Sequence, residues 1–285
     1  MKNIFGFGVW MAVFATLFVG CGQQDVADRG VHTFKAPLYW SVYEYCWSLE
    51  KQGIPASEMD ISEEQWDKII DWVATELKPF GYDMVCTDGF IPMLVKDDSG
   101  YMTHYGSMSL KKLVEKCKAR GLRVGVYDNP LWIHGADDTV IEGTDGITFG
   151  DLRYKESDSV HRTDVGDTWF GWAVATHKGA KEYIDNFFKH FAEMGVDYIR
   201  MDFLSWYEDG MDRGMGVVGR GYGRDTYELA LKYISESATK YGVFTSLVMP
   251  HLNDKAALES KYGNMVRIVA DTGNGGWAHF SDTQR

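Results

Sequence analysis

The sequence is poor in the features that mark several large classes of protein. Lys and Arg number 29 against 41 Asp and Glu, which gives a formal net charge of −12. A surface with this excess of negative charge repels phosphate backbones, so we expect no nucleic-acid partner. The chain also lacks a basic run, the glycine pattern of a phosphate-binding loop, and Cys and His residues at zinc-site spacing.

Cysteine is scarce as well, with four residues in the chain. Three of them, Cys46, Cys86 and Cys117, could form at most one disulfide, so the sequence is not that of a disulfide scaffold. Cys86 lies within a strand-like segment and Cys117 on the apolar face of a helix-like segment. We therefore expect buried thiols at both positions.

The fourth cysteine closes the one long apolar run of the chain. Lys2 precedes this run, which extends from Ile4 to Val19 and is followed by Gly20-Cys21. The run is short for spanning about 30 Å of hydrocarbon, and a small residue directly before Cys is typical of a bacterial lipoprotein signal. We expect residues 1–21 to be a signal peptide with Cys21 lipidated, and residues 22–35 to be a flexible tether. This predicts a lipid-anchored protein of the bacterial cell envelope, periplasmic or at the cell surface; a membrane-spanning anchor is the alternative.

Beyond residue 36, strand-like and helix-like segments alternate. The strand-like segments are 37–43, 82–88, 122–127, 196–202, 243–248 and 265–270. Repeated units with almost continuously apolar strands indicate a parallel sheet covered by helices, which favours a (β/α)8 TIM barrel; a doubly wound open sheet is the alternative. Because six strands are found where a barrel has eight, we expect residues 36–285 to form a (β/α)-barrel catalytic domain whose last units are missing.

Acidic residues mark the ends of these strands, where (β/α)8 barrels carry their functional residues. Four strand-like segments end at, or directly before, an aspartate: Asp88, Asp128, Asp202 and Asp271. A buried acid costs free energy unless it is paired or faces a cleft, so four of them on one rim favour a functional cleft over helix caps or structural ion pairs. Trp40 and Tyr43 at the first strand end, and Trp277 in a rim loop, offer aromatic faces for stacking on sugar; core packing is the alternative.

Two of these acids suit the cleavage of a glycosidic bond, which needs one ionised and one protonated carboxyl group. Arg200 precedes Asp202 by two residues and thus lies on the same face of the strand. A nearby cation keeps an acid ionised, so Asp202 suits the nucleophile. Asp271 follows an apolar run, which suits a proton donor of raised pKa, although the neighbouring Arg267 favours the opposite.

Four segments together resemble the strand motifs of the α-galactosidase/α-N-acetylgalactosaminidase (melibiase) family of retaining glycoside hydrolases. They are residues 81–88, 122–127, 197–202 and 267–271, and their order and spacing match over residues 37–277. The joint order of the motifs carries the resemblance, because none of them is specific alone.

The resemblance implies a double displacement on a carbohydrate substrate. Asp202 forms the covalent glycosyl intermediate, and Asp271 protonates the leaving group and then deprotonates water. It further implies that Asp88 binds sugar hydroxyls, that Tyr127 lines the pocket beside the nucleophile, and that Arg267 holds a hydroxyl near the anomeric centre. No metal or organic cofactor is implied.

The sequence departs from the family pattern around the sugar. Galactosidases of this family have a second acid where Gly89 follows Asp88, a lysine at the substrate-contacting position of Arg200, an acid near Val248 and a tryptophan near Tyr43. Losing buried hydrogen-bond partners changes specificity strongly. α-Galactosides are therefore the default substrates, while β-L-arabinopyranosides, an α-glucan, or glycan binding without catalysis stay open.

Overall fold

The computed structural model describes residues 36–55, 58–89, 93–98, 100–157, 160–161 and 171–268. All of them belong to one compact unit, His32–Arg285. The expected signal peptide and tether, with Cys21, lie outside the described residues, as do Asp271 and Trp277. Within the described part of the chain, no helix has the length and apolar character needed to cross a membrane.

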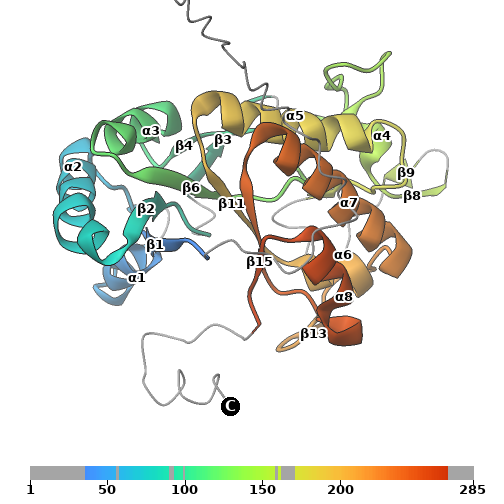
Figure 1. Cartoon of the computed structure of the whole chain (residues 1–285). Helices are drawn as coiled ribbons and strands as arrows, with labels where there is room; N and C mark the ends of the chain where they lie inside the picture. The colour runs from blue at the N-terminus through green and yellow to red at the C-terminus, as the bar shows by residue number, and fades with distance from the viewer. Residues whose placement is uncertain are drawn as a thin grey trace, which may run out of the picture. The chain divides into compact units, whose positions relative to one another are not determined.

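A six-stranded parallel sheet forms the centre of the molecule (Figure 1). Its strands are β1 (Leu38–Ser41), β2 (Tyr82–Cys86), β6 (Arg123–Tyr127), β11 (Tyr198–Met201), β14 (Phe244–Leu247) and β15 (Met265–Val266). Each strand pairs in parallel with the next in chain order. This order is that of a (β/α)8 barrel, whereas the order of a doubly wound sheet reverses at a switch point. The predicted fold class is therefore confirmed.

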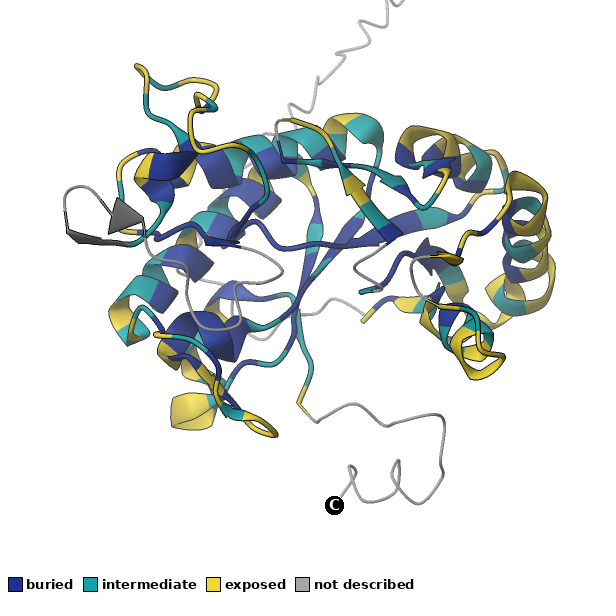
Figure 2. Ribbon diagram, turned by 180° about the vertical axis from the view of Figure 1, so that it is seen from behind, coloured by how far each residue is buried: buried dark blue, intermediate teal, exposed yellow. Residues whose placement is uncertain are grey.

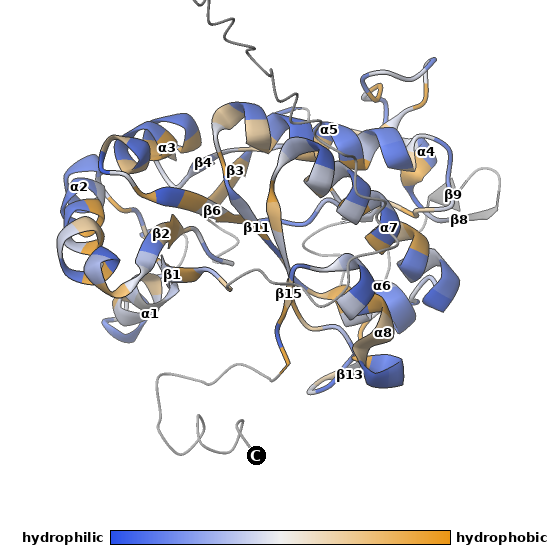
Figure 3. Ribbon diagram, viewed as in Figure 1, coloured by the Kyte–Doolittle hydropathy of each residue, from blue (hydrophilic) through white to orange (hydrophobic). Residues whose placement is uncertain are grey.

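Helices cover the outer face of this sheet. They are α1 (Tyr43–Lys51), α2 (Glu63–Trp72), α3 (Leu110–Ala119), α5 (Ala180–Met194), α7 (Arg224–Tyr241) and α8 (Asn253–Tyr262). The strands are largely buried and the helices expose their outer sides (Figure 2), and the same sides carry the hydrophilic residues (Figure 3). This layering is what parallel strands with apolar residues on both faces require.

Local sequence signals explain the boundaries of helix α2. The Ser62 hydroxyl accepts from the Gln65 backbone N–H, and the Gln65 side chain accepts from the Ser62 N–H, so the two residues form a capping box. Trp66 and Ile70 are fully buried. The segment ends at Gly81, whose φ of +93° favours glycine. Helix α3 begins without such a cap, because the side chain of Ser109 before it makes no cap hydrogen bond.

Alternation along the strands divides the apolar residues into two sets. Val85, Val124 and Ile199 pack in the large core with the helices. A second set on the opposite face consists of Met84, Cys86 and Tyr198, with Tyr39, Phe244 and Met265 packed against them. This second set covers the inner face of the sheet, the face that in a closed barrel lines the packed interior. Cys46, Cys86 and Cys117 are free and buried, which confirms the expectation of buried thiols.

Several elements were not predicted. An antiparallel sheet of β3 (Leu94–Lys96), β4 (Met102–Tyr105) and β5 (Met108–Ser109) lies between β2 and α3 along the chain. The long stretch between β6 and α5 holds β7 (Trp132–Ile133), α4 (Phe149–Leu152), β8 (Lys155–Ser157), β9 (Val160–His161) and β10 (Gly171–Trp172). After β11 come α6 (Leu204–Asp209) and a hairpin of β12 (Met211–Asp212) and β13 (Gly216–Val217).

Candidate active site

Asp202 directly follows β11 at the carboxyl end of the sheet and is 8% exposed. Its Oδ2 accepts a hydrogen bond of 2.9 Å from the Tyr127 hydroxyl, and its Oδ1 accepts one of 2.8 Å from the Phe203 backbone N–H. Tyr127 reaches this position because it ends β6, the strand beside β11. Phe203 has a φ of 61°, a left-handed conformation that turns the chain directly after the carboxylate. The carboxylate is therefore fixed at both oxygens.

The charge state of Asp202 depends on opposing effects. Burial raises the pKa of its carboxyl group above the ordinary value, whereas the charges of Arg200 and Arg267 and the bonds from Phe203 and Tyr127 lower it. A nucleophilic carboxylate must be ionised to attack. The two arginines and the two donors thus favour the reactive form in a site where burial alone favours the neutral one.

Arg200 makes its direct contact with another acid. Its guanidinium donates to Asp88 Oδ2 over 2.9 Å, and the two side chains are 17% and 6% exposed. Asp88 also accepts from the Ser41 hydroxyl, and from the Gly89 backbone N–H at 2.6 Å. The charge of Arg200 acts on Asp202 in the expected direction, since it lowers the pKa of that carboxyl group, while its hydrogen bond goes to Asp88.

A buried ion pair and an asparagine also lie at the carboxyl end of the sheet, beside Asp202. Lys96, from β3, places its Nζ 2.7 Å from both carboxylate oxygens of Asp128, which follows β6. These side chains are 10% and 0% exposed. Asn129 then donates through Nδ2 to the backbone oxygen of Asp202 over 2.8 Å. Asp128 stood among the strand-end acids, but Lys96 and Asn129 were missed, because neither belongs to a periodic segment of the sequence.

Two aromatic residues expected at the site are placed differently. Trp40 lies on the face of β1 opposite Ser41, and its ring packs edge-on against Trp72 of α2 at 6.4 Å. It does not join the Asp202 group, because its face of the strand is turned to the helices. Tyr43 begins α1, stacks on Trp47 at 6.1 Å and is 40% exposed. The strand-end position expected for Tyr43 is therefore wrong; Ser41 holds it.

The remaining expected residues divide into two groups. Arg267 follows β15, its backbone N–H donates to the Leu247 oxygen over 2.9 Å, and its charge acts on Asp202. Asp271 and Trp277 lie outside the described residues, so their places at the site stay predictions.

Aromatic residues and a histidine close the site from the side of the β6–α5 connection. The ring of Trp132 lies 5.9 Å from that of Tyr127 and 6.2 Å from that of Phe203, and it is 2% exposed. His134 packs edge-on against Trp132 at 6.0 Å. Burial, together with the charges of Lys96 and Arg153, lowers the pKa of His134 to about 2. This imidazole is thus neutral at any pH near neutrality.

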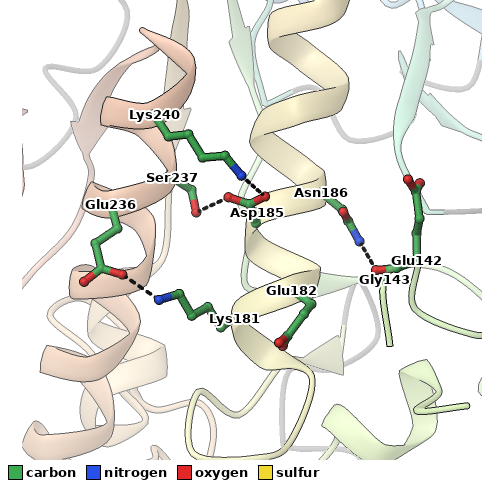
Figure 4. A pocket seen from close by; sticks show the side chains of 9 residues that line it. All are labelled: Glu142, Gly143, Lys181, Glu182, Asp185, Asn186, Glu236, Ser237 and Lys240. Atoms are coloured by element: carbon green, nitrogen blue, oxygen red, sulfur yellow. Dashed lines mark hydrogen bonds and ion pairs between the residues drawn. The ribbon is translucent and has the colours of Figure 1, made fainter. Parts of the chain in front are cut away.

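A second concave feature lies on the outside of the barrel, between α5 and α7 (Figure 4). Four of its charged side chains form two ion pairs: Lys181 with Glu236 at 3.0 Å, and Lys240 with Asp185 at 2.7 Å. None of the expected site residues lines this groove. Elsewhere in the described residues, no group of three or more His, Cys, Asp or Glu side chains is placed to hold a metal ion.

Comparison with known proteins supports a carbohydrate-active barrel. No family model matches the chain. Over 254 residues it is 37% identical to isomalto-dextranase of Arthrobacter globiformis, covering 86% of this chain and 38% of that protein. The structure of that organism's isomalto-dextranase complexed with panose superposes with a TM-score of 0.72 at 35% identity, covering 86% of this chain and 41% of that one.

More distant structures share the fold. A GH27 β-L-arabinopyranosidase from Geobacillus stearothermophilus gives a TM-score of 0.55 at 19% identity, covering 82% of this chain and 53% of that one. An α-galactosidase from Thermus thermophilus gives 0.56 at 17% identity, covering 83% and 44%. The chain spans about two-fifths of the length of isomalto-dextranase. All these proteins are glycoside hydrolases, so the expected resemblance holds at that level, and the galactosidase family is represented among the structural neighbours.

Proposed function

We propose that this chain is a retaining glycoside hydrolase that acts on an α-glucan, with Asp202 as the nucleophile and Asp271 as the acid/base. The observation that carries the proposal is the setting of Asp202. It is a buried carboxylate at the carboxyl end of a barrel strand, held by the Tyr127 hydroxyl and the Phe203 N–H. Active sites of (β/α)8 enzymes occupy this end of the strands.

The proposed reaction is a double displacement. A carboxylate oxygen of Asp202 attacks the anomeric carbon while Asp271 gives its proton to the leaving glycosidic oxygen, and a covalent glycosyl ester forms. Asp271 then removes a proton from water, whose oxygen displaces Asp202 and releases the sugar. Arg200 and Arg267 favour the ionised form of Asp202 before attack. Tyr127 orients the carboxylate through Oδ2.

An α-glucan is favoured over an α-galactoside by the surroundings of Asp88. A Cβ atom at Gly89 would lie 2.7 Å from the ring of Tyr127, so the second acid of the galactosidase pattern does not fit beside this tyrosine. Val248, at the end of β14, is buried and apolar where that pattern has another acid. The identity of 37% to an isomalto-dextranase points the same way.

Hydrolysis assays with matched variants test the proposal. The full chain, Asp202→Ala and the control Asp185→Ala are incubated with dextran, panose, and nitrophenyl α-glucoside, α-galactoside and β-L-arabinopyranoside. Asp185 is an acid of the outer groove, so its loss tests for general damage. We expect release of glucose-containing products by wild type and by Asp185→Ala, and none by Asp202→Ala. NMR of the first product should show the anomeric configuration of the substrate.

Other outcomes of the same assays separate the alternatives. If only the galactoside or only the arabinopyranoside were hydrolysed, the α-glucan would be the wrong substrate class, while the proposed role of Asp202 would stand. Glycan binding by wild type without turnover of any substrate would replace the enzyme with a binding protein.

We further propose that the protein is anchored to the membrane of the bacterial cell envelope through a lipid on Cys21. The support is the sequence Gly20-Cys21 after the apolar run. Expression in a bacterium with labelled palmitate should label the wild type in the membrane fraction. Cys21→Ala should lose the label, and an unlabelled wild type would rule the anchor out.

A further inference from the structure

We propose that Asn129 is a positioning residue for Asp202 and that the buried Lys96–Asp128 pair holds it in place. This inference rests on the proposed function, since it assigns these residues a role toward the nucleophile. The role is carried by geometry at the junction of β6 and β11, where hydrogen bonding continues beyond the ends of the two strands.

Both ends of the Asn129 carboxamide are used. Nδ2 donates to the Asp202 backbone oxygen over 2.8 Å, and Oδ1 accepts from the Leu131 N–H at 2.9 Å. The side chain is fully buried. A buried carbonyl beyond the end of a strand costs free energy unless it finds a donor, and Asn129 supplies one at the residue proposed to react. It does so without touching the carboxylate itself.

The neighbouring residue ties this turn to the rest of the molecule. The backbone N–H of Asp128 donates to the Arg200 oxygen over 3.2 Å, so it extends the ladder between β6 and β11 by one step. Its carboxylate accepts from the Asn129 N–H at 2.8 Å and from Lys96 at both oxygens. Lys96 belongs to the β3–β5 sheet. That sheet is therefore linked to the turn that supports the nucleophile.

A rigid support matters for attack at carbon. The reacting atoms must approach to about 3–3.5 Å in alignment, and a displacement of about 1 Å costs roughly 100-fold in rate. The strand does not continue beyond Asp202 to hold its backbone, because Phe203 leaves the strand conformation with a φ of 61°. Asn129 and the Phe203 N–H thus fix the nucleophile from its backbone and from its side chain.

Two substitutions of Asn129 separate positioning from turn formation. Asn129→Asp keeps the oxygen that Leu131 needs and removes the Nδ2 donor, whereas Asn129→Ala removes both. The control is Asn264→Ala: Asn264 Oδ1 accepts from the Thr245 N–H and hydroxyl, at the opposite end of β14. Steady-state kinetics are measured well below the unfolding temperature. We expect kcat to fall about 100-fold in both Asn129 variants with KM within about twofold, and no fall in the control.

The pH profile tests whether the side chain at position 129 faces Asp202, whereas the loss of kcat at unchanged KM tests the positioning role itself. The new carboxylate in Asn129→Asp lies beside Asp202, so the acid limb of kcat should shift to higher pH in this variant and not in Asn129→Ala. The same shift is expected in a carbon-13 NMR titration of the Asp202 carboxyl group. Wild-type kcat in Asn129→Asp, or equal losses in Asn129→Asp and Asn264→Ala, would overturn the inference.

The proposed function can fail separately. If the wild-type chain hydrolysed no substrate, the proposed hydrolase function would be rejected, and NMR alone would then test the role of Asn129. The carbon-13 resonance of the Asp202 backbone carbonyl, which accepts from Asn129 Nδ2, should then move in both Asn129 variants and not in Asn264→Ala. An unmoved resonance would remove the positioning role as well.

Discussion

Two regions of the molecule hold ion pairs of the same length in different surroundings. At the carboxyl end of the sheet, Lys96–Asp128 and Arg200–Asp88 are joined over 2.7 and 2.9 Å by side chains that are at most 17% exposed. In the outer groove of Figure 4, Lys181–Glu236 and Lys240–Asp185 are joined over 3.0 and 2.7 Å by side chains that are 27–58% exposed. Distance does not distinguish the two sets; access to water does.

The difference decides what each pair can do. The two charges of an exposed pair stay hydrated and attract each other weakly, so such a pair adds about 0–1 kcal/mol to the free energy of unfolding. In a buried pair each charge depends on the other, so the loss of one partner leaves an uncompensated charge. Both interior acids also bind a backbone N–H, Gly89 for Asp88 and Asn129 for Asp128. The interior pairs therefore fix the turns around Asp202, whereas the outer pairs lie on the exposed surfaces of helices α5 and α7.

The largest effect is expected from breaking the better buried pair. Lys96→Met preserves the length of the side chain and leaves Asp128 buried without its cation. We expect a loss of about 3–5 kcal/mol in the free energy of unfolding, measured by urea denaturation at pH 7. A loss below about 1 kcal/mol would mean that water reaches Asp128, and the contrast between the two regions would disappear.

The buried histidine beside this pair predicts sensitivity to acid. The folded pKa of His134, about 2, lies below the ordinary value of 6.5, so below pH 6.5 the unfolded chain takes up a proton that the folded chain does not. Stability is thus complete well above pH 6.5, and as pH falls below 6.5 its slope approaches about 1.4 kcal/mol per pH unit, or about 2.3 kcal/mol between pH 6.5 and 4.5.

Removal of the imidazole tests this dependence. In His134→Gln the slope of the unfolding free energy against pH should be smaller by about 1.4 kcal/mol per pH unit over that range, which corresponds to the uptake of one proton. A parallel slope in wild type and variant would show that other groups cause the acid sensitivity. The matched control is His251→Gln, at a histidine paired with the half-exposed Asp209.

A smaller effect on catalysis is expected from the hydroxyl that bonds Asp202. Tyr127→Phe removes a donor that lowers the pKa of this carboxyl group, so the pKa should rise further above its ordinary value. The acid limb of kcat/KM should move to higher pH, and activity at neutral pH should fall about tenfold. An unchanged pH profile would contradict a functional bond between the two groups. Tyr101→Phe, remote from Asp202 against Phe187, serves as the control.

The sequence predicts the secondary structure around this site better than the side-chain contacts within it. The strands and the capping box at Ser62 follow from patterns within a few residues, and strand ends bring Asp88, Asp128 and Asp202 to one rim. The contact of Lys96 with Asp128 joins residues 32 apart through a sheet whose short strands have no clear period. It could not be predicted from local patterns.

The first strand shows a second limit of local patterns. The run from Leu38 to Tyr43 is apolar or aromatic almost throughout, which predicts one strand to its end. The structure ends the strand at Ser41 and starts a helix at Tyr43. One tertiary and one local contact lie at this boundary: the Ser41 hydroxyl donates to Asp88, and it accepts from the Tyr43 N–H two residues on. Once the boundary moves by two residues, a different side chain reaches the site.

The smallest effect should come from the outer groove. Partial burial raises the pKa of Asp185, but hydrogen bonds from Lys240, Tyr241 and Ser237 outweigh it and hold the pKa below its ordinary value. This carboxylate therefore adds stability above its unfolded pKa, and the contribution is lost as pH falls through the folded pKa. Lys240→Met removes one of three donors at a half-exposed position, so we expect a loss in urea denaturation far smaller than that of Lys96→Met, and reduced further by 1 M salt. A loss as large as that of Lys96→Met would show that exposure does not separate the two regions, since only the surroundings differ between these lysines.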